Sequence, residues 1–163
     1  MDERMCSGRL LLKPLPLDGM TQIWRKDPSF LKQSVISQVI LDAVAHKMDQ
    51  MRQVPSDLHP WLTYWLIQEK ESKEGIGLIG CKSLPDPQGY VELGYAMARE
   101  CRRKGYMTEA LLCFLDWLYG CPFCNGAMLS IQCGNEGSRK VAKRCGFVCE
   151  GIKEGSGLYR YRF

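Results

Sequence analysis

The hydrophobic pattern changes its period beside Gly105, and this change is the feature that most constrains the fold. Residues 90–98 alternate between apolar residues and polar or small ones, which predicts a strand. Residues 106–119 instead repeat apolar residues at helical spacing, and Gly120 ends the predicted helix. A strand that leads through a short loop into a helix predicts a mixed α/β fold.

Further strands and helices are expected on both sides of this pair. The strands are expected at residues 9–12, 61–67, 76–83, 127–132, 147–152 and 158–163. The helices are expected at residues 24–51, with one break at Asp27-Pro28, and at 138–145. The strands at 61–67, 76–83 and 90–98 follow one another through short turns, which predicts a three-strand meander. No repeat or linker interrupts the pattern, so a single domain over residues 1–163 is expected.

The composition limits the class of protein. The 163 residues are 45% hydrophobic and 25% charged, which is typical of a globular domain. No apolar run is long enough for a transmembrane helix, and the first five residues lack the apolar core of a signal peptide. Nine scattered cysteines indicate reduced thiols, so a cytoplasmic protein is expected. A net charge of +4 is too small to indicate nucleic-acid binding, although it suits a small anionic ligand.

A basic loop, defined here as residues 102–107, leads from the strand at 90–98 into the long helix. It carries Arg102, Arg103 and Lys104 directly before Gly105. The first turn of a helix leaves amides unpaired and carries partial positive charge, so such a start can bind an anion. From these residues alone, a solvated basic loop is an equal alternative. The segment lacks the glycine spacing and the Gly-Lys-Ser/Thr ending of a Walker P-loop.

Asn135 and Ser138 stand at the start of the short helix at 138–145. Residues of these types usually cap a helix. Arg139 and Lys140 follow in the first turn, where positive charge opposes the helix dipole. A bound phosphate or plain solvation could offset this charge, so both a capping role and a binding role stay open.

The basic loop resembles the coenzyme A signature of the GNAT superfamily of N-acetyltransferases, Arg/Gln-x-x-Gly-x-Gly/Ala. Arg102 matches its first position and Gly105 its fourth, whereas Met107 departs from the last. The run from Gly105 to Ala110, Gly-Tyr-Met-Thr-Glu-Ala, is similar to the Rim-type branch, which acts on the N-termini of ribosomal proteins.

A second GNAT motif, Asn-x-x-Ser/Ala followed by Gly-Phe, is similar to Asn135, Ser138 and Gly146-Phe147. The resemblance covers nearly the whole chain. It implies a GNAT-like α/β (α+β) fold, in which a central mixed, mostly antiparallel sheet of six to seven strands has helices on both faces.

The resemblance also implies that acetyl-coenzyme A is the co-substrate and that no metal is needed. Amides of the basic loop would bind the pyrophosphate. The strand at 90–98 would splay from the strand at 127–132 and pair its backbone with the pantetheine arm, and the N–H of Met97 would stabilise the oxyanion. The residues expected at this cofactor are Tyr95, Ala96, Met97, Arg102, Arg103, Lys104, Gly105, Tyr106, Met107, Thr108, Asn135 and Ser138.

The catalytic groups are less clearly marked. Many GNAT members place a tyrosine four residues before the motif glycine to protonate the leaving thiolate, but this chain has Ala142 there. Ser138 or a water is therefore expected to supply the proton. Glu92 is the expected general base, acting through water, and an ordinary surface glutamate is an equal alternative. Glu92 and Met97 differ in strand parity, so a bulge would be needed to bring both to one site.

The predicted function is transfer of the acetyl group of acetyl-coenzyme A to a primary amine, by direct attack in a ternary complex. The acceptor could be a protein N-terminal amine, a polyamine, an amino acid or an antibiotic, and the Rim-type resemblance favours the first. Many GNAT members are homodimers, and the sequence leaves the oligomeric state open. His46 and His59 are expected to be structural or solvated, although His59 could line the acceptor side.

Two other functions remain as alternatives. One is a module that senses acetyl-coenzyme A without turnover. The other is a redox or zinc protein built on the CxxC pair of Cys121 and Cys124. That pair follows a helix and leads into a strand, which is the reverse of a redox motif, and zinc would need a second pair of ligands.

Overall fold

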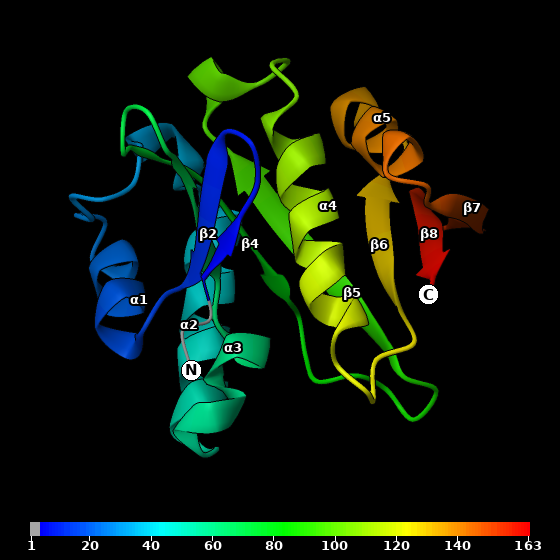
Figure 1. Cartoon of the computed structure of the whole chain (residues 1–163), viewed down its shortest axis with the longest axis horizontal. Helices are drawn as coiled ribbons and strands as arrows, with labels where there is room; N and C mark the ends of the chain where they lie inside the picture. Colours follow the sequence, from blue (N-terminus) through cyan, green and yellow to red (C-terminus); the bar gives the residue numbers. More distant parts are fainter. Residues whose placement is uncertain (1–3) are drawn as a thin grey trace.

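The computed structural model describes residues 4–163, which form one eight-stranded sheet with helices on both faces (Figure 1). The strand order is β1-β2-β3-β4-β5-β6-β8-β7, and every neighbouring pair is antiparallel except β5 and β6. The strands are β1 (Met5–Cys6), β2 (Leu10–Pro14), β3 (Trp65–Glu69), β4 (Gly75–Cys81), β5 (Tyr90–Met97), β6 (Gly126–Gln132), β7 (Val148–Lys153) and β8 (Ser156–Arg162). The mixed, mostly antiparallel α/β architecture is confirmed, with a two-residue edge strand β1 beyond the six to seven strands expected.

The helices form two layers. The α-helices are α1 (Leu17–Trp24), α2 (Gln38–Arg52), α3 (His59–Leu62), α4 (Tyr106–Tyr119) and α5 (Glu136–Arg144). Short 3-10 turns are η1 (Gln33–Val35), η2 (Ser56–Leu58) and η3 (Arg99–Cys101). Helix α4 lies in front of the sheet in Figure 1 with α5 beside it, whereas α2 lies behind β2 and packs against α1 and α3. No helix within residues 4–163 is long and apolar enough to cross a membrane.

The prediction of one helical region over residues 24–51 is wrong in its first half. Helix α1 ends at Trp24, and α2 begins only after Ser37, whose hydroxyl caps it by accepting from the amide of Ile40 at 3.3 Å. The chain between them pairs instead with the start of β4, because the Lys32 amide donates to the Gly75 carbonyl at 2.9 Å. Leu31 and Val35 are buried there. Their i+4 spacing therefore reflects tertiary packing and not a helix.

The strand expected at residues 61–67 also begins later than predicted. Trp61 and Leu62 belong to α3, which has Pro60 in its first turn, a position that suits proline. Trp65 then opens β3, and its indole N–H donates to the Pro60 carbonyl at 2.8 Å. Aromatic composition alone could not separate the helical turn from the strand that follows it.

The remaining predicted elements are confirmed to within a few residues. Helix α4 covers residues 106–119 as expected, and its apolar face is buried against the sheet. The Trp65 and Phe114 rings meet edge to face at 5.7 Å, which joins β3 to α4 in the core. The meander of β3, β4 and β5 and the hairpin of β7 and β8 are present with the predicted order.

Candidate cofactor and acceptor site

Strands β5 and β6 separate after a short stretch of pairing. They are in parallel register only from Tyr90 opposite Gly126 to Glu92 opposite Met128. Beyond Glu92, β5 continues to pair with β4 and β6 continues to pair with β8. The sheet therefore opens between two strands that are each held from their outer side, as the family resemblance implied.

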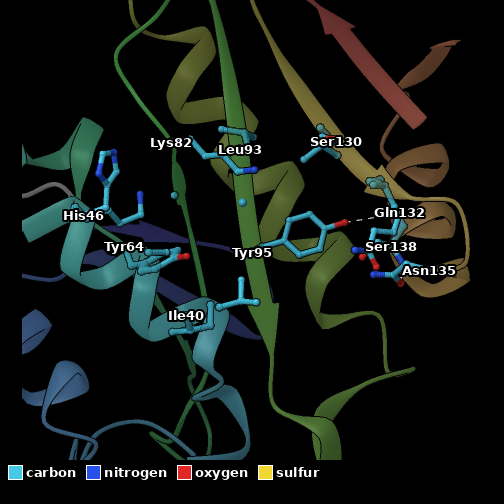
Figure 2. A pocket seen from close by; sticks show the side chains of 17 residues that line it. Ile40, His46, Tyr64, Lys82, Leu93, Tyr95, Ser130, Gln132, Asn135 and Ser138 are labelled. Atoms are coloured by element: carbon cyan, nitrogen blue, oxygen red, sulfur yellow. Dashed lines mark hydrogen bonds between the residues drawn. The ribbon is translucent and has the colours of Figure 1, made fainter. Parts of the chain in front are cut away.

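A cavity of about 540 Å³ occupies this opening. One side, here called the α2 side, is lined by residues of α2, β4 and the chain next to them, including His46, Lys47, Tyr64 and Lys82. The opposite side, here called the α5 side, is lined by β6 and by Asn135 and Ser138 at the start of α5. Figure 2 shows Tyr64 and His46 across the cavity from Ser138 and Asn135.

Tyr95 lies between the two sides. Its ring extends from β5 toward α5 in Figure 2, and its hydroxyl donates to the Ser138 carbonyl at 3.5 Å. Burial raises the pKa of Tyr95, and the hydrogen bond to Ser138 opposes part of that rise. The phenol therefore keeps its proton at neutral pH, within the cavity and beside Ser138. The sequence had assigned Tyr95 a role through its backbone only, and nothing local distinguishes a strand tyrosine that reaches a helix start.

The ladder pattern of β5 shows which of its backbone groups face the opening. Lys82 N–H donates to the Glu92 carbonyl, and Ala98 N–H donates to the Ile76 carbonyl, each at 2.8 Å. Hydrogen-bonded positions alternate in an antiparallel pair, so Ala96 also directs its amide and carbonyl toward β4. The residues between them, including Tyr95 and Met97, direct theirs toward the opening. Of the three backbone positions expected at the pantetheine arm, two thus face the cavity side and Ala96 does not.

The basic loop presents a row of amides without protein partners. Within residues 4–163, no protein atom accepts a hydrogen bond from the backbone N–H groups of residues 103–108. No side chain caps the start of α4. Arg103 and Gly105 both adopt the left-handed conformation, with φ of 63° and 80°. Arg103 and Lys104 are exposed, whereas Met107 is buried in the core. The loop thus combines free donors, two cations and a helix start, which is a favourable arrangement for a phosphate.

Side chains from outside the loop hold it in place. Arg9 donates to the Lys104 carbonyl at 3.0 Å, pairs with Glu109 at 2.8 Å, and stacks on the Tyr106 ring at 4.2 Å. The Tyr106 hydroxyl donates to Glu69 on β3. Sequence reasoning read Arg9 only as the start of a strand, because its partners lie about a hundred residues away.

The electrostatics of this support favour an ionised Glu109. Burial alone would raise the pKa of Glu109, but hydrogen bonds from Ser7 and Arg9 hold the pKa below its ordinary value. The Ser7 hydroxyl donates at 2.6 Å and the Arg9 amide at 2.7 Å. From the loop itself, the Arg102 side chain donates to the Met97 carbonyl at 3.2 Å. The loop is therefore anchored to Arg9 before β2, to Glu69 on β3 and to Met97 on β5, while its own amides at 103–107 have no acceptor within residues 4–163.

The second motif has a clear structural role. The Asn135 side-chain oxygen accepts from the Ser138 amide at 3.1 Å, so Asn135 caps α5. Arg139 donates to the Cys133 carbonyl at 3.2 Å, which uses one of the cations of the first turn. Asn135 and Ser138 also line the cavity, so capping does not remove them from reach of a ligand. Ala142 is fully buried and offers no proton donor.

Glu92 is not among the residues that line the cavity, and it reaches the α2 side only through Lys82. Its carboxylate is 3.4 Å from the Lys82 ammonium, and Lys82 lines the cavity. The register between β4 and β5 runs without a bulge, so the bulge that would bring the side chains of Glu92 and Met97 to one face is not present. A strand N–H lies in the plane of the sheet, so Met97 can direct its amide into the opening without one.

The CxxC segment does not have the features of a reactive pair. Burial raises the pKa of Cys124, and its thiol donates to the Gly126 carbonyl at 3.5 Å. The Cys121 thiol donates to the Trp117 carbonyl at 3.4 Å. Across residues 4–163, no group of three or more His, Cys, Asp or Glu side chains is arranged to hold a metal. His59 is held by the Met51 carbonyl at 2.6 Å, whereas His46 lines the cavity.

Comparison with known proteins agrees with this geometry. A family model described as "Acetyltransferase (GNAT) domain" matches residues 9–148. The uncharacterized N-acetyltransferase YjdG of Bacillus subtilis (strain 168) is 31% identical over 84 residues, which are 52% of this chain and 50% of YjdG. The uncharacterized N-acetyltransferase p20 of Bacillus licheniformis is 28% identical over 153 residues, which are 92% of this chain and 85% of p20.

Solved structures share the fold at lower identity. The RimL ribosomal L7/L12 alpha-N-protein acetyltransferase in complex with coenzyme A has a TM-score of 0.72 and 15% sequence identity. The match covers 99% of this chain and 97% of that chain.

Proposed function

The chain belongs to the GNAT acetyltransferase family, and we propose that it transfers the acetyl group of acetyl-coenzyme A to a primary amine. The observation that carries this proposal is the opening between β5 and β6 together with the unbonded amides of residues 103–108. A diphosphate needs such donors at a helix start, and a thioester arm needs an opening in the sheet. The structural neighbour RimL, solved with coenzyme A, supports the same assignment.

The cofactor would lie along the α5 side. Amides of the basic loop would bind the pyrophosphate, with Arg103 and Lys104 adding charge and Arg9 holding the loop. The backbone groups of Tyr95 that face the opening would pair with the amides of the pantetheine arm, much as a missing strand would, and the Met97 N–H would stay available for the thioester. The thioester would then lie in the cavity between Tyr95 and the α2 side.

The reaction is one acyl transfer. The neutral amine attacks the thioester carbonyl, the new C–N bond forms, and the C–S bond breaks with its electron pair leaving on sulfur. Holding both reactants in one cavity supplies part of the rate enhancement, and the Met97 N–H would stabilise the oxyanion. Glu92 would take the amine proton through a water.

Two hydroxyls are placed to return a proton to sulfur. Ser138 lines the cavity at the start of α5, and the Tyr95 hydroxyl lies beside it. Tyr95 would supply the phenol that Ala142 lacks, because its hydroxyl extends from β5 to the start of α5, the helix that carries Ala142. We assign the proton that returns to sulfur to this pair of hydroxyls, with Tyr95 as the main donor.

The acceptor enters from the α2 side in this proposal. A protein N-terminal amine is the acceptor that the Rim-type similarity favours, and the name of RimL specifies such a substrate for that enzyme. A homodimer stays a prediction, and sedimentation of the purified chain tests it.

The test has two steps. Acetyl-coenzyme A should raise the melting temperature of the purified protein, and a thiol-release assay with a panel of amines should then show turnover. Absence of any cofactor binding would contradict the proposal. Binding without thiol release for every amine would leave the sensor module as the better assignment.

A further inference from the structure

The α2 side of the cavity carries positive charge that the cofactor site described above does not use. Lys47 and Lys82 both line the cavity, whereas none of the lining residues is Asp or Glu. Lys82 has a counter-ion at the rim, since Glu92 lies 3.4 Å from it. Lys47 has no carboxylate partner among the described residues.

Lys47 is an unusual residue at this position. Its side chain is 4% exposed, and its ammonium donates to the Cys81 carbonyl at 2.6 Å and to the Leu62 carbonyl at 3.4 Å. The face of the Tyr64 ring covers a third side of the ammonium, with its centroid 4.6 Å from the nitrogen. Carbonyls and an aromatic face solvate the cation but leave its net charge in place.

The neighbourhood makes this charge costly. Burial, with a smaller contribution from the like charge of Lys82, lowers the pKa of Lys47 to about 8. Tyr64 cannot serve as a counter-ion, because burial raises its pKa to about 12. One negative charge in the α2 side would offset both the desolvation of Lys47 and its repulsion from Lys82.

We propose that the acceptor amine carries a carboxylate, which the α2 side binds through the charge of Lys47. This inference rests on the proposed function and names the class of its substrate. A single carboxylate matches Lys47, the one lysine of the cavity lining that has no carboxylate partner among the described residues. Polycationic amines such as spermidine are poor acceptors for the same reason, since their charge opposes that of Lys47 and Lys82.

Matched acceptors that differ only in charge test the inference. One arm compares a free amino acid with its amide, and a second arm compares a tripeptide with Asp at position two with the same tripeptide carrying Asn. In at least one arm, kcat/KM for the acid should exceed that for the amide by about ten-fold or more, because the Lys47 charge attracts the carboxylate within a partly buried site. The two arms separate an α-carboxylate from a side-chain carboxylate as the source.

Variants identify the residue responsible. Lys47→Met should bring the acid-to-amide ratio to about one while the affinity for acetyl-coenzyme A stays unchanged, and Lys153→Met, an exposed lysine on β7, should keep the wild-type ratio. A purely structural role of Lys47 would lower the rates of acid and amide equally. If Lys47→Met does not fold, Lys82→Met provides the second variant and should reduce the ratio in part.

Three outcomes are distinguishable. An acid preference that disappears in Lys47→Met supports the inference. Equal rates for acid and amide in the wild-type protein, or a ratio that survives in Lys47→Met, overturn it while leaving acetyl transfer intact. No transfer to any amine overturns the proposed function itself.

Discussion

The two sides of the cavity recognise their ligands by different means. The α5 side and the basic loop offer mainly backbone groups, because within residues 4–163 the amides of residues 103–108 and the inward N–H groups of Tyr95 and Met97 have no protein acceptor. The α2 side offers side chains, among them Lys47, Tyr64 and Lys82. Backbone recognition needs a particular local conformation, whereas side-chain recognition needs residues that only the fold brings together.

The strongest way to break this comparison is to disturb the conformation of the basic loop. Gly105 has a φ of 80°, and an added Cβ would lie 3.4 Å from the Arg9 guanidinium. Gly105→Val should weaken acetyl-coenzyme A binding about 100-fold and destabilise the protein by about 1–2 kcal/mol, because a β-branched residue resists the left-handed region. Calorimetric titration with acetyl-coenzyme A measures the affinity. Gly120→Ala, at the other end of α4 with a φ of −72°, is the matched control and should bind normally.

A second test asks whether Glu92, which pairs with Lys82 of the α2 side, is the general base. Glu92→Gln should lower kcat about 10–100-fold with little change in acetyl-coenzyme A affinity, because the carboxylate would act only on the amine. Loss of the exposed ion pair to Lys82 should cost less than about 1 kcal/mol of stability. Steady-state kinetics and thermal melting measure the two effects. An unchanged kcat would remove Glu92 from the mechanism.

A third test separates the two hydroxyls on the α5 side. Tyr95→Phe keeps the ring and removes the proton donor, and it should lower kcat about ten-fold. Ser138→Ala should have a smaller effect, because Ser138 is only half-buried and a water can replace its hydroxyl. Burial raises the pKa of Tyr95, so the wild-type rate should fall only at alkaline pH, as the phenol loses its proton. If Tyr95→Phe retains that alkaline fall and full activity, the proton comes from elsewhere.

The support of the basic loop gives the smallest expected effect. Arg9→Met should weaken acetyl-coenzyme A binding a few-fold, because the Lys104 carbonyl and the Tyr106 ring lose their partner. Glu109 should also contribute to acid stability. Its folded pKa lies below the ordinary 4.5, so its contribution is complete above that value and is lost as the pH falls below it. In thermal melting, the melting temperature of Glu109→Gln should therefore fall less than that of the wild type as the pH is lowered below about 4.5. Glu136→Gln, a control at an exposed position, should follow the wild type.

The same contrast explains what the sequence could show. The helix at 106–119 and the loop before it were predictable, because period, glycine position and charge are all local features. The splay of β5 and β6 followed only from the family resemblance. Lys47 falls within the helix predicted over residues 24–51, but its partners Cys81 and Tyr64 come from other elements, so no local pattern could indicate its role. Leu31 and Val35 are buried at i+4 spacing outside any α-helix, so tertiary burial can imitate a helical pattern.

The central claim is that the backbone amides of residues 103–107 bind the diphosphate of coenzyme A. Amide nitrogen NMR during titration with coenzyme A tests this directly. The account predicts that the largest amide shifts arise in residues 103–107, with smaller shifts at Tyr95 and Met97. Saturable binding with the largest shifts on the α2 side and none in the basic loop would contradict it.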